Sequence, residues 1–183
     1  ASDVYKRQEK HRGLRELSGK TACIIGTGSV GSAIARRLRA FDVQTVGINR
    51  SGHPAAEFDQ TQPTCRLDDL LPLADLVSCA MPLTAETAGL FDSVRLAKIK
   101  PGAVFVNVAR GKVTDQQALV EALQSGQLSG AVLDVFEEEP LPRSSPLWDM
   151  EQVILTPHNS FVGEHNGERL FRLFCKNLES FAQ

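Results

Sequence analysis

The feature that most constrains how this chain folds is a glycine-rich segment, Gly26–Gly31, with the spacing G-x-G-x-x-G. It directly follows the apolar run Thr21–Ile25, which is predicted to be a strand. The segment Val30–Phe41 comes next and carries apolar residues at helical spacing, which predicts a helix. Such a turn between a strand and a helix is typical of dinucleotide-binding domains. This context makes a glycine-rich turn without a ligand the weaker interpretation.

Each glycine of the turn has a physical reason to be there. Gly26 permits the tight turn, Gly28 lets a pyrophosphate approach the backbone, and Gly31 lets the helix pack against the strand. Ser29 and Val30 open the helix, and free N–H groups at a helix N-terminus attract phosphate oxygens. We therefore expect these five residues to contact a cofactor.

The rest of the chain alternates short apolar runs with helical patterns. Further strands are predicted at Val43–Ile48, Leu76–Ala80, Ala103–Val106, Leu128–Leu133 and Val153–Leu155. Further helices are predicted at Leu67–Leu71, at Asp115–Gln124 with Thr114 as its cap, and at Arg169–Phe181. Alternating strands and helices imply parallel pairing. The predicted fold is α/β, a Rossmann-type doubly wound and mainly parallel sheet with helices on both faces.

The expected domain organisation has three parts. Residues 1–18 are a polar lead-in without a core, interpreted as the end of a missing domain or an interdomain helix. Residues 19–163 form the dinucleotide-binding domain, and residues 164–183 form a C-terminal helix. The first residue is Ala1 rather than Met, which favours a fragment of a longer protein.

Composition and charge argue against several partners. Hydrophobic residues make up 42% of the 183 residues, charged residues make up 23%, and the formal net charge is -2. This balance gives no electrostatic reason to bind nucleic acid or anionic membrane. No apolar run approaches the roughly 20 residues that span a bilayer, and the charged N-terminus is unlike a signal peptide. The sequence therefore predicts neither nucleic-acid nor membrane partners.

The four cysteines are Cys23, Cys65, Cys79 and Cys175, and none belongs to a C-x-x-C pair. Metal sites need clustered ligands, so no metal is predicted. We interpret all four as reduced, structural thiols in a reducing compartment, which implies a cytoplasmic location.

The choice of cofactor depends on the end of the second strand. An acidic residue there would accept hydrogen bonds from the ribose 2'-hydroxyl, but Asn49 occupies the position. Arg50 and Ser51 follow and could bind a 2'-phosphate by charge and hydrogen bond. The hypothesis is that the domain tolerates or prefers NADP. The alternative is that Arg50 is simply solvated, so both cofactors, NAD and NADP, stay open.

Three polar stretches follow predicted strands, at Val106–Gly111, Leu133–Pro140 and Leu155–Ser160. In doubly wound sheets, ligands bind beyond the carboxyl ends of the strands. We therefore expect these stretches to lie together near the cofactor.

At this point the chain resembles the cofactor-binding domain of the D-isomer-specific 2-hydroxyacid dehydrogenases, which include phosphoglycerate dehydrogenases and glyoxylate/hydroxypyruvate reductases. The likeness runs from about Leu14 to Gln183 in the family's order. The motifs that carry it are Ile24–Gly31, Met81–Thr84, Asn107–Gly111, Asp134–Pro140 and Thr156–His158.

The resemblance implies a catalytic set of Arg110, Glu139 and His158. Arg110 would hold the substrate carboxylate and carbonyl, because a guanidinium fork suits a planar carboxylate. His158 would donate a proton to the carbonyl oxygen as hydride arrives, and accept it in reverse. Glu139 would hydrogen-bond the histidine and favour its protonated form. Glu139 is preferred to Glu137 and Glu138 because, like the family's acid, it directly precedes Pro140.

The same resemblance implies further cofactor contacts. Asp134 would contact the nicotinamide end, and His158 and Arg110 would also border the cofactor. The groove would be lined, largely through backbone, by Ala80, Met81, Pro82, Leu83, Asn107, Val108 and Ala109.

Each catalytic candidate has a simpler interpretation when taken alone. Arg110 could form a surface salt bridge, Glu139 could be a solvated acid, and a loop backbone could satisfy His158. Within the matched motifs, we favour the functional interpretation for all three. The remaining histidines, His11, His53 and His165, match no motif and are expected at the surface.

The leading hypothesis is an oxidoreductase domain that interconverts a 2-oxo acid and a D-2-hydroxy acid with NAD(P)(H). One alternative is a non-catalytic dinucleotide-sensing or partner-binding module on the same fold, and another is a different nicotinamide dehydrogenase. Family members usually carry a substrate domain upstream, so this chain is expected to bind dinucleotide but turn over poorly alone. The resemblance also implies a homodimer through the cofactor domain, and a C-terminal helix that returns toward the substrate domain.

Overall fold

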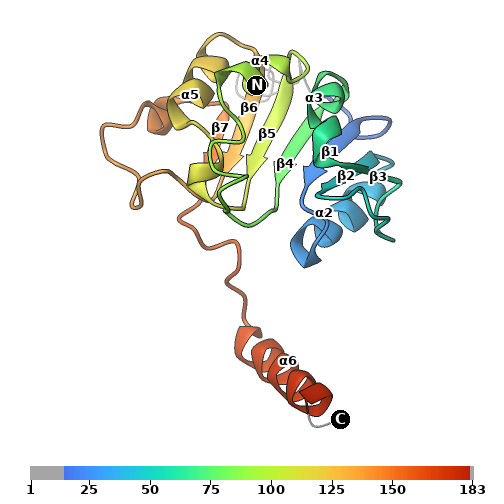
Figure 1. Ribbon diagram of the computed structural model, residues 1–183. Helices are drawn as coiled ribbons and strands as arrows, with labels where there is room; N and C mark the ends of the chain where they lie inside the picture. Colours follow the sequence, from blue (N-terminus) through green and yellow to red (C-terminus); the bar gives the residue numbers. More distant parts are fainter. Residues whose placement is uncertain (1–14, 182–183) are drawn as a thin grey trace, which may run out of the picture.

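Seven short strands of this chain pair side by side into one sheet. The structure, a computed structural model, describes residues 15–181 and is drawn in Figure 1. The strands are β1 (Thr21–Ile25), β2 (Gln44–Asn49), β3 (Gln60–Pro63), β4 (Leu76–Cys79), β5 (Ala103–Asn107), β6 (Leu128–Leu133) and β7 (Val153–Leu155). Their order is β3-β2-β1-β4-β5-β6-β7, and every neighbouring pair is parallel. The order reverses between β1 and β4, where doubly wound sheets bind ligands.

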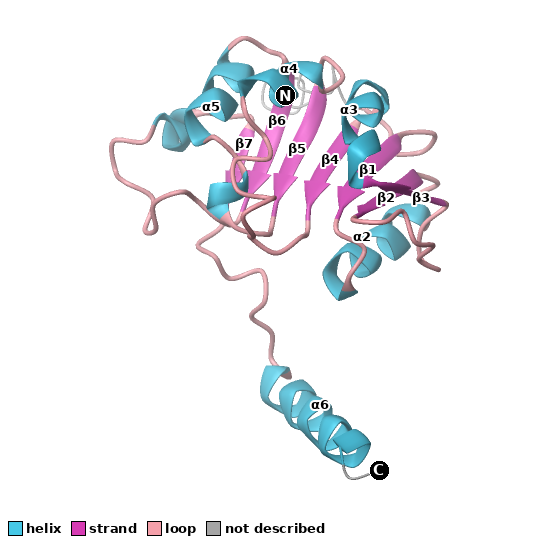
Figure 2. Ribbon diagram, viewed as in Figure 1, coloured by secondary structure: helices cyan, strands magenta, loops and turns pink. Residues whose placement is uncertain are grey.

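Helices cover this sheet from both sides (Figure 2). The α-helices are α2 (Ser29–Arg39), α3 (Leu67–Leu70), α4 (Ser93–Lys98), α5 (Gln116–Gln124) and α6 (Asn166–Phe181). Short 3-10 turns are η1 (Thr64–Arg66), η2 (Leu71–Leu73), η3 (Gly111–Val113) and η4 (Pro146–Asp149). The predicted α/β, doubly wound parallel sheet is therefore confirmed.

The two faces of the sheet have separate cores because successive strand residues point to opposite sides. On one face, Ala22 and Ile24 of β1 pack with Ala35 of α2. On the other face, Cys23 and Ile25 belong to a larger core that includes side chains of α3, α4 and α5. Alternation along β1 thus explains why the run Thr21–Ile25 is apolar throughout.

Coverage of the α2 face weakens toward β7. Val106, Val132 and Ile154 lie in register across β5, β6 and β7 on this face. Val106 and Val132 are half-buried, whereas Ile154 is 60% exposed. The described helices therefore cover this face more completely over β1 and β2 than over β5, β6 and β7.

The C-terminal helix α6 stands apart from the sheet in Figure 1. It begins at Asn166, three residues before the predicted start at Arg169. Its apolar side chains are all more than half exposed, namely Leu170, Phe171, Leu173, Phe174, Leu178 and Phe181. The prediction that this helix packs against a substrate domain stays a prediction.

Several local predictions were wrong. Asp115, and not Thr114, caps α5, because its carboxylate accepts the Ala118 amide hydrogen while Thr114 is buried. Strand β3 was missed because its sequence Gln-Thr-Gln-Pro is polar and lies at the sheet edge, and helix α4 was missed because it is only 6 residues long. All four thiols were expected to be structural; Cys23 and Cys79 are buried, whereas Cys65 is exposed and Cys175 is only half-buried.

The predicted lead-in, residues 1–18, lies mostly outside the described residues, as does His11. Within residues 15–181, no helix combines the length and apolar character that a membrane crossing requires. Within the same range, no cluster of three or more His, Cys, Asp or Glu side chains could hold a metal ion.

Candidate functional site

The glycine-rich turn joins β1 to α2 at the carboxyl edge of the sheet. Gly26 has φ +108, a backbone conformation that side chains disfavour, and an added Cβ would lie 2.5 Å from the Ala80 carbonyl oxygen. A Cβ on Gly31 would overlap the Gly26 carbonyl oxygen. These two glycines therefore allow β1, β4 and the start of α2 to approach one another closely.

Gly28 has a different role from its neighbours. A Cβ at Gly28 would meet no protein atom within 4 Å, so its surroundings within residues 15–181 do not require a glycine. Gly28 is the N-cap of α2, no side chain among the described residues caps the helix, and its first turn contains no acid. The first N–H groups of α2 are thus available to an anion, and open space beside Gly28 suits the close approach of a phosphate.

A cavity of about 350 Å³ lies next to this turn. Its lining comes from three elements that are far apart in sequence, the start of α2 and the loops after β4 and β5. The lining residues are Val30, Ala80, Met81, Pro82, Leu83, Val108, Ala109 and Arg110. The expected groove residues other than Asn107, which is buried, thus line one cavity at the point where the strand order reverses.

The residues after β2 lie beside the glycine turn. The Asn49 side-chain amide donates to the Thr27 hydroxyl at 3.2 Å and to the His53 carbonyl at 2.8 Å, and its oxygen accepts the His53 amide hydrogen at 3.1 Å. Asn49 therefore organises its own loop, while Arg50 and Ser51 are exposed. The Thr84 hydroxyl and, more weakly, the Arg50 charge keep the pKa of Glu86 below its ordinary value.

Asn107, at the end of β5, shapes the loop that carries Arg110. Its buried side chain accepts the Ala109 amide hydrogen at 3.0 Å and donates to the Arg110 carbonyl at 3.1 Å. The Arg110 guanidinium donates to the Ala109 carbonyl at 2.7 Å and is otherwise exposed. The Asn107 side chain thus holds the loop in place, and the guanidinium of Arg110 stays available at the rim of the cavity.

Gly111 brings the Arg110 loop against the loop after β6. An added Cβ would overlap the carbonyl group of Phe136. In the same region Gln116 and Glu137 exchange hydrogen bonds, with the Gln116 amide donating at 3.0 Å and the Glu137 amide donating at 3.3 Å. Sequence reasoning assigned no role to Gly111 or Glu137, because their partners lie more than twenty residues away along the chain.

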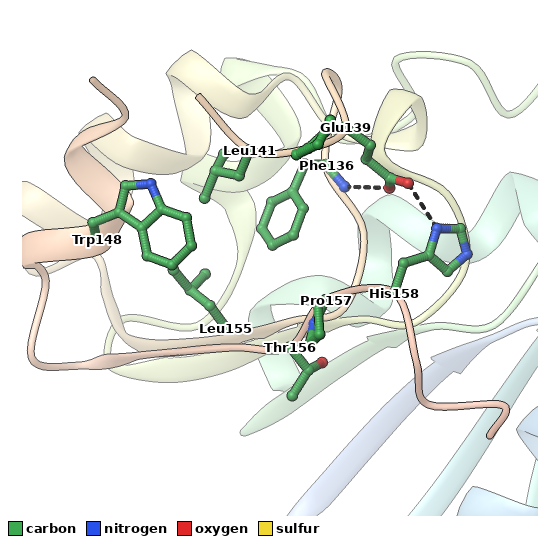
Figure 3. Close-up of a pocket in the computed structure, with 9 residues that line it drawn as sticks. Phe136, Glu139, Leu141, Trp148, Leu155, Thr156, Pro157 and His158 are labelled. Atoms are coloured by element: carbon green, nitrogen blue, oxygen red, sulfur yellow. Dashed lines mark hydrogen bonds and ion pairs between the residues drawn. The ribbon is translucent and has the colours of Figure 1, made fainter. Parts of the chain in front are cut away.

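The carboxylate of Glu139 joins the loop after β6 to the loop after β7. One oxygen accepts the Phe136 amide hydrogen at 3.0 Å, and the other lies 2.7 Å from His158 Nδ1 (Figure 3). The hydrogen bond from His158, followed by that from Phe136, holds the pKa of Glu139 below its ordinary value. An ionised Glu139 therefore accepts from Nδ1–H, which leaves Nε2 of His158 as the nitrogen available to a substrate.

A larger cavity of about 650 Å³ has this pair in its lining. Figure 3 shows Trp148, Leu155 and Phe136 around it, with His158 and Glu139 at its edge. The pair therefore stands between an apolar cavity and solvent, with 37% of the His158 side chain and 35% of the Glu139 side chain exposed.

Asp134 is the most buried acid of the site, at 2% exposure. Burial favours the neutral form, but hydrogen bonds from Ser160, Thr156 and Asn159 outweigh it and hold the pKa below its ordinary value. The sequence analysis assigned Asp134 to the nicotinamide end and found no signal for these contacts to the loop after β7.

The predicted catalytic residues therefore meet through a chain of contacts. The Arg110 loop touches the Phe136 backbone through Gly111, Phe136 donates to Glu139, and Glu139 bonds His158. His53 and His165 are exposed, in agreement with the prediction for these two.

Comparisons with known proteins support the predicted family. Residues 2–160 match the sequence model of a family described as D-isomer specific 2-hydroxyacid dehydrogenase, NAD binding domain. The glyoxylate reductase of Pyrococcus furiosus is 40% identical over 166 residues, which cover 91% of this chain and 49% of that protein. The chain thus spans about half the length of this relative.

Solved structures give the same result. A D-isomer specific 2-hydroxyacid dehydrogenase family protein from Aeromonas salmonicida has a TM-score of 0.84 and 39% identity, covering 98% of this chain and 59% of that one. A probable 2-hydroxyacid dehydrogenase from Rhizobium etli, in complex with NADP, HEPES and L(+)-tartaric acid, has a TM-score of 0.84 and 32% identity, covering 99% of this chain and 58% of that one. The chain therefore belongs to the D-isomer specific 2-hydroxyacid dehydrogenase family, and residues 2–160 correspond to the family's NAD binding domain.

Proposed function

We propose that this chain is the cofactor-binding part of an oxidoreductase that interconverts a 2-oxo acid and a D-2-hydroxy acid. The observation that carries the proposal is the hydrogen bond of 2.7 Å between Glu139 and His158 Nδ1, at the same sheet edge as Arg110 and the glycine turn. A domain that only senses dinucleotide has no need of an oriented proton donor. The whole reaction is proposed for the complete gene product, because the chain spans about half the length of its relatives.

The residues around the turn fit a nicotinamide dinucleotide. The open space at Gly28 and the uncapped start of α2 suit a pyrophosphate, and the cavity lined by Ala80–Leu83 and Val108–Arg110 continues from them. When bound there, the cofactor supplies or accepts the hydride.

His158 handles the proton of the same reaction. During reduction, Nε2–H of His158 donates its proton to the carbonyl oxygen of the 2-oxo acid, and the hydride adds to the carbonyl carbon, so the product is a hydroxyl group. Glu139 accepts from Nδ1–H, which fixes the ring and stabilises the imidazolium before transfer. In the reverse direction, neutral His158 takes the hydroxyl proton.

Arg110 binds the negative end of the substrate. Its guanidinium presents a planar fork of N–H donors that matches a carboxylate. The hydrogen bonds from Asn107 hold the Arg110 loop in place. We propose glyoxylate as the first substrate to test, because the Pyrococcus furiosus relative bears the name glyoxylate reductase.

The experiment is steady-state glyoxylate reduction by the complete gene product that contains this chain, before and after His158→Ala. We expect kcat to fall by a factor on the order of 10²–10⁴. His165→Ala is the matched control, since His165 is exposed and directly precedes α6, away from the sheet edge. Turnover by His158→Ala within twofold of the parent would refute the role of His158, and dinucleotide binding without any turnover by the parent would favour a sensing module.

We also propose that the domain prefers NADP(H). Arg50 and Ser51 are exposed beside Asn49, the position lacks an acid, and the Rhizobium etli relative was solved with NADP. Fluorescence titration of this chain should give tighter binding of NADPH than of NADH. Arg50→Gln should weaken NADPH binding by about 10-fold, because a charge-assisted hydrogen bond contributes about 1.5 kcal/mol or more.

The control for this titration is Arg36→Gln, which removes an exposed charge from α2. It should leave the ratio of NADPH to NADH affinities unchanged. Equal or tighter binding of NADH by the parent chain would overturn the proposed preference.

The remaining proposals concern the chain as a whole. We expect the chain alone to bind dinucleotide without efficient turnover, because hydride transfer needs the substrate held in near-attack geometry and shielded from water. A homodimer and a C-terminal helix that packs on a substrate domain are proposed on the family resemblance. Light scattering of the complete gene product at twice its chain mass would support the dimer.

A further inference from the structure

Asp134 follows β6 directly and lies beneath the loop that carries His158. Its carboxylate accepts the Thr156 hydroxyl at 2.5 Å, the Asn159 amide at 3.0 Å and the Ser160 amide at 3.1 Å. No lysine, arginine or histidine among residues 15–181 forms an ion pair with it. The buried charge is therefore stabilised by donors from a single loop.

These donors stand on both sides of His158. Thr156 precedes it by two residues, and Asn159 and Ser160 directly follow it. His158 itself has φ 51, in the left-handed region that residues other than glycine rarely adopt. Its amide also donates to the Thr156 carbonyl at 3.0 Å, so the backbone turns tightly at this point. Such a conformation persists only where its surroundings enforce it.

We infer that Asp134 is a positioning residue, whose carboxylate holds the loop around His158 in the left-handed turn that brings Nδ1 to Glu139. This inference rests on the proposed function, because it matters to catalysis only if His158 transfers the proton. It is a role beside the contact with nicotinamide that family resemblance implies, because Oδ1 accepts two loop donors and Oδ2 accepts only one.

A carboxylate is chemically required by this arrangement. Its two oxygens accept from donors on both sides, whereas an amide of the same shape has only one acceptor oxygen and one NH₂ group. In Asp134→Asn, the single amide oxygen can accept either from Thr156 and Asn159 or from Ser160. It cannot accept from both groups of donors at once. One N–H of the loop then faces an N–H of the side chain, and the turn loses its anchor.

The test uses Asp134→Asn in this chain and in the complete gene product, with Asp149→Asn as the control because Asp149 is exposed. Hydrogen exchange of the chain without substrate should be faster by about 10-fold or more at the amides of Asn159 and Ser160. The amides of β1 and β4 should keep their protection. In ¹⁵N spectra, the His158 Nδ1 signal should move toward that of a histidine without a carboxylate partner.

The kinetic arm separates positioning from cofactor binding. Asp134→Asn should lower kcat for glyoxylate by about 10-fold or more, a larger factor than any rise in the KM for NADPH. Unchanged exchange at Asn159 and Ser160 would overturn the inference. A raised KM for NADPH with unchanged exchange in the loop would also overturn the inference and favour a nicotinamide contact. A general loss of protection in β1 and β4 would overturn it too, because Asp134 would then stabilise the whole fold rather than position His158.

The exchange and ¹⁵N measurements need no turnover. If the loop responds as expected and the parent gene product reduces no 2-oxo acid, the proposed function fails while the anchoring of the loop by Asp134 stands. If the parent is active and the loop does not respond, the inference fails and the proposed function stands.

Discussion

The two sides of the candidate site are built by different means. Around Gly26–Gly31, the shape depends on backbone atoms and on missing side chains, because a Cβ at Gly26 or Gly31 would run into neighbouring carbonyl groups. Around His158, the shape depends on carboxylates, because Glu139 and Asp134 in the loop after β6 accept the hydrogen bonds that come from the loop after β7.

This difference predicts different sensitivities. Among the residues that the structure describes, no titratable group holds the shape of the glycine side, so this side responds to added volume rather than to acid. The histidine side responds to the loss of a single negative charge, because a buried or partly buried acceptor without its charge cannot hold the same donors. Changes confined to one side should therefore separate cofactor binding from turnover.

After the loss of turnover in His158→Ala, the largest expected effect is the loss of cofactor affinity in Gly28→Ala. The new methyl group meets no protein atom within 4 Å, so the melting temperature should stay near that of the parent. It would occupy the space proposed for the pyrophosphate, and loss of two charge-assisted hydrogen bonds weakens binding by about 100-fold. Calorimetric titration with NADPH is the measurement.

Gly167→Ala is the control, because Gly167 in α6 also has open space around its Cβ position. It should bind NADPH like the parent. An affinity of Gly28→Ala within threefold of the parent would mean that the phosphates do not approach the turn at Gly28.

The next effect is on turnover in Glu139→Gln. The amide keeps the shape but loses the charge that stabilises protonated His158, so kcat should fall by about 10-fold. The affinity for NADPH should not change, because Glu139 is not part of the groove beside the turn. Steady-state kinetics and titration together test this, and a loss of affinity with normal kcat would contradict the division between the two sides.

A smaller effect is expected from acid. The folded pKa of Glu139 is lowered from 4.5, so its contribution is fully present above 4.5 and disappears only as pH falls through the lower, folded value. The Glu139–His158 pair should thus still be formed at pH 4.5, as observed by the ¹⁵N signal of His158. Loss of the pair well above this pH would contradict the direction of the shift.

The smallest effects separate the two neighbouring acids, Glu137 and Glu138. Glu137→Ala removes a hydrogen bond to the Gln116 amide at the start of α5 and should lower stability by about 0.5–1.5 kcal/mol, with kcat unchanged. Glu138→Ala removes an exposed side chain and should change neither quantity. Urea unfolding measures the difference, and equal stabilities for the two variants would show that the contact with Gln116 contributes nothing.

The sequence predicts the glycine side better than the histidine side for a physical reason. Every requirement at Gly26–Gly31 is expressed within one turn and its adjoining strand and helix, so spacing alone identifies it. Arg110, Glu139 and His158 could be singled out only by resemblance, because their meeting depends on how β5, β6 and β7 lie side by side.

The missed contacts have the same origin. Asp134 and Ser160 are separated by 26 positions and Glu137 and Gln116 by 21, and no local pattern announces such pairs. The cap of α5 was wrong by one residue because Thr114 and Asp115 are both good capping residues, and only the buried position of Thr114 decides between them.

The most direct test of the account is the fate of the hydride. The complete gene product that contains this chain should be incubated with glyoxylate and NADPH carrying deuterium at the transferable C4 position of the nicotinamide. We predict that the glycolate formed carries deuterium on C2, as measured by mass spectrometry. Glycolate formed without deuterium, or cofactor bound with no reduction of glyoxylate or any other 2-oxo acid offered, would contradict the assignment of this chain to a hydride-transferring enzyme.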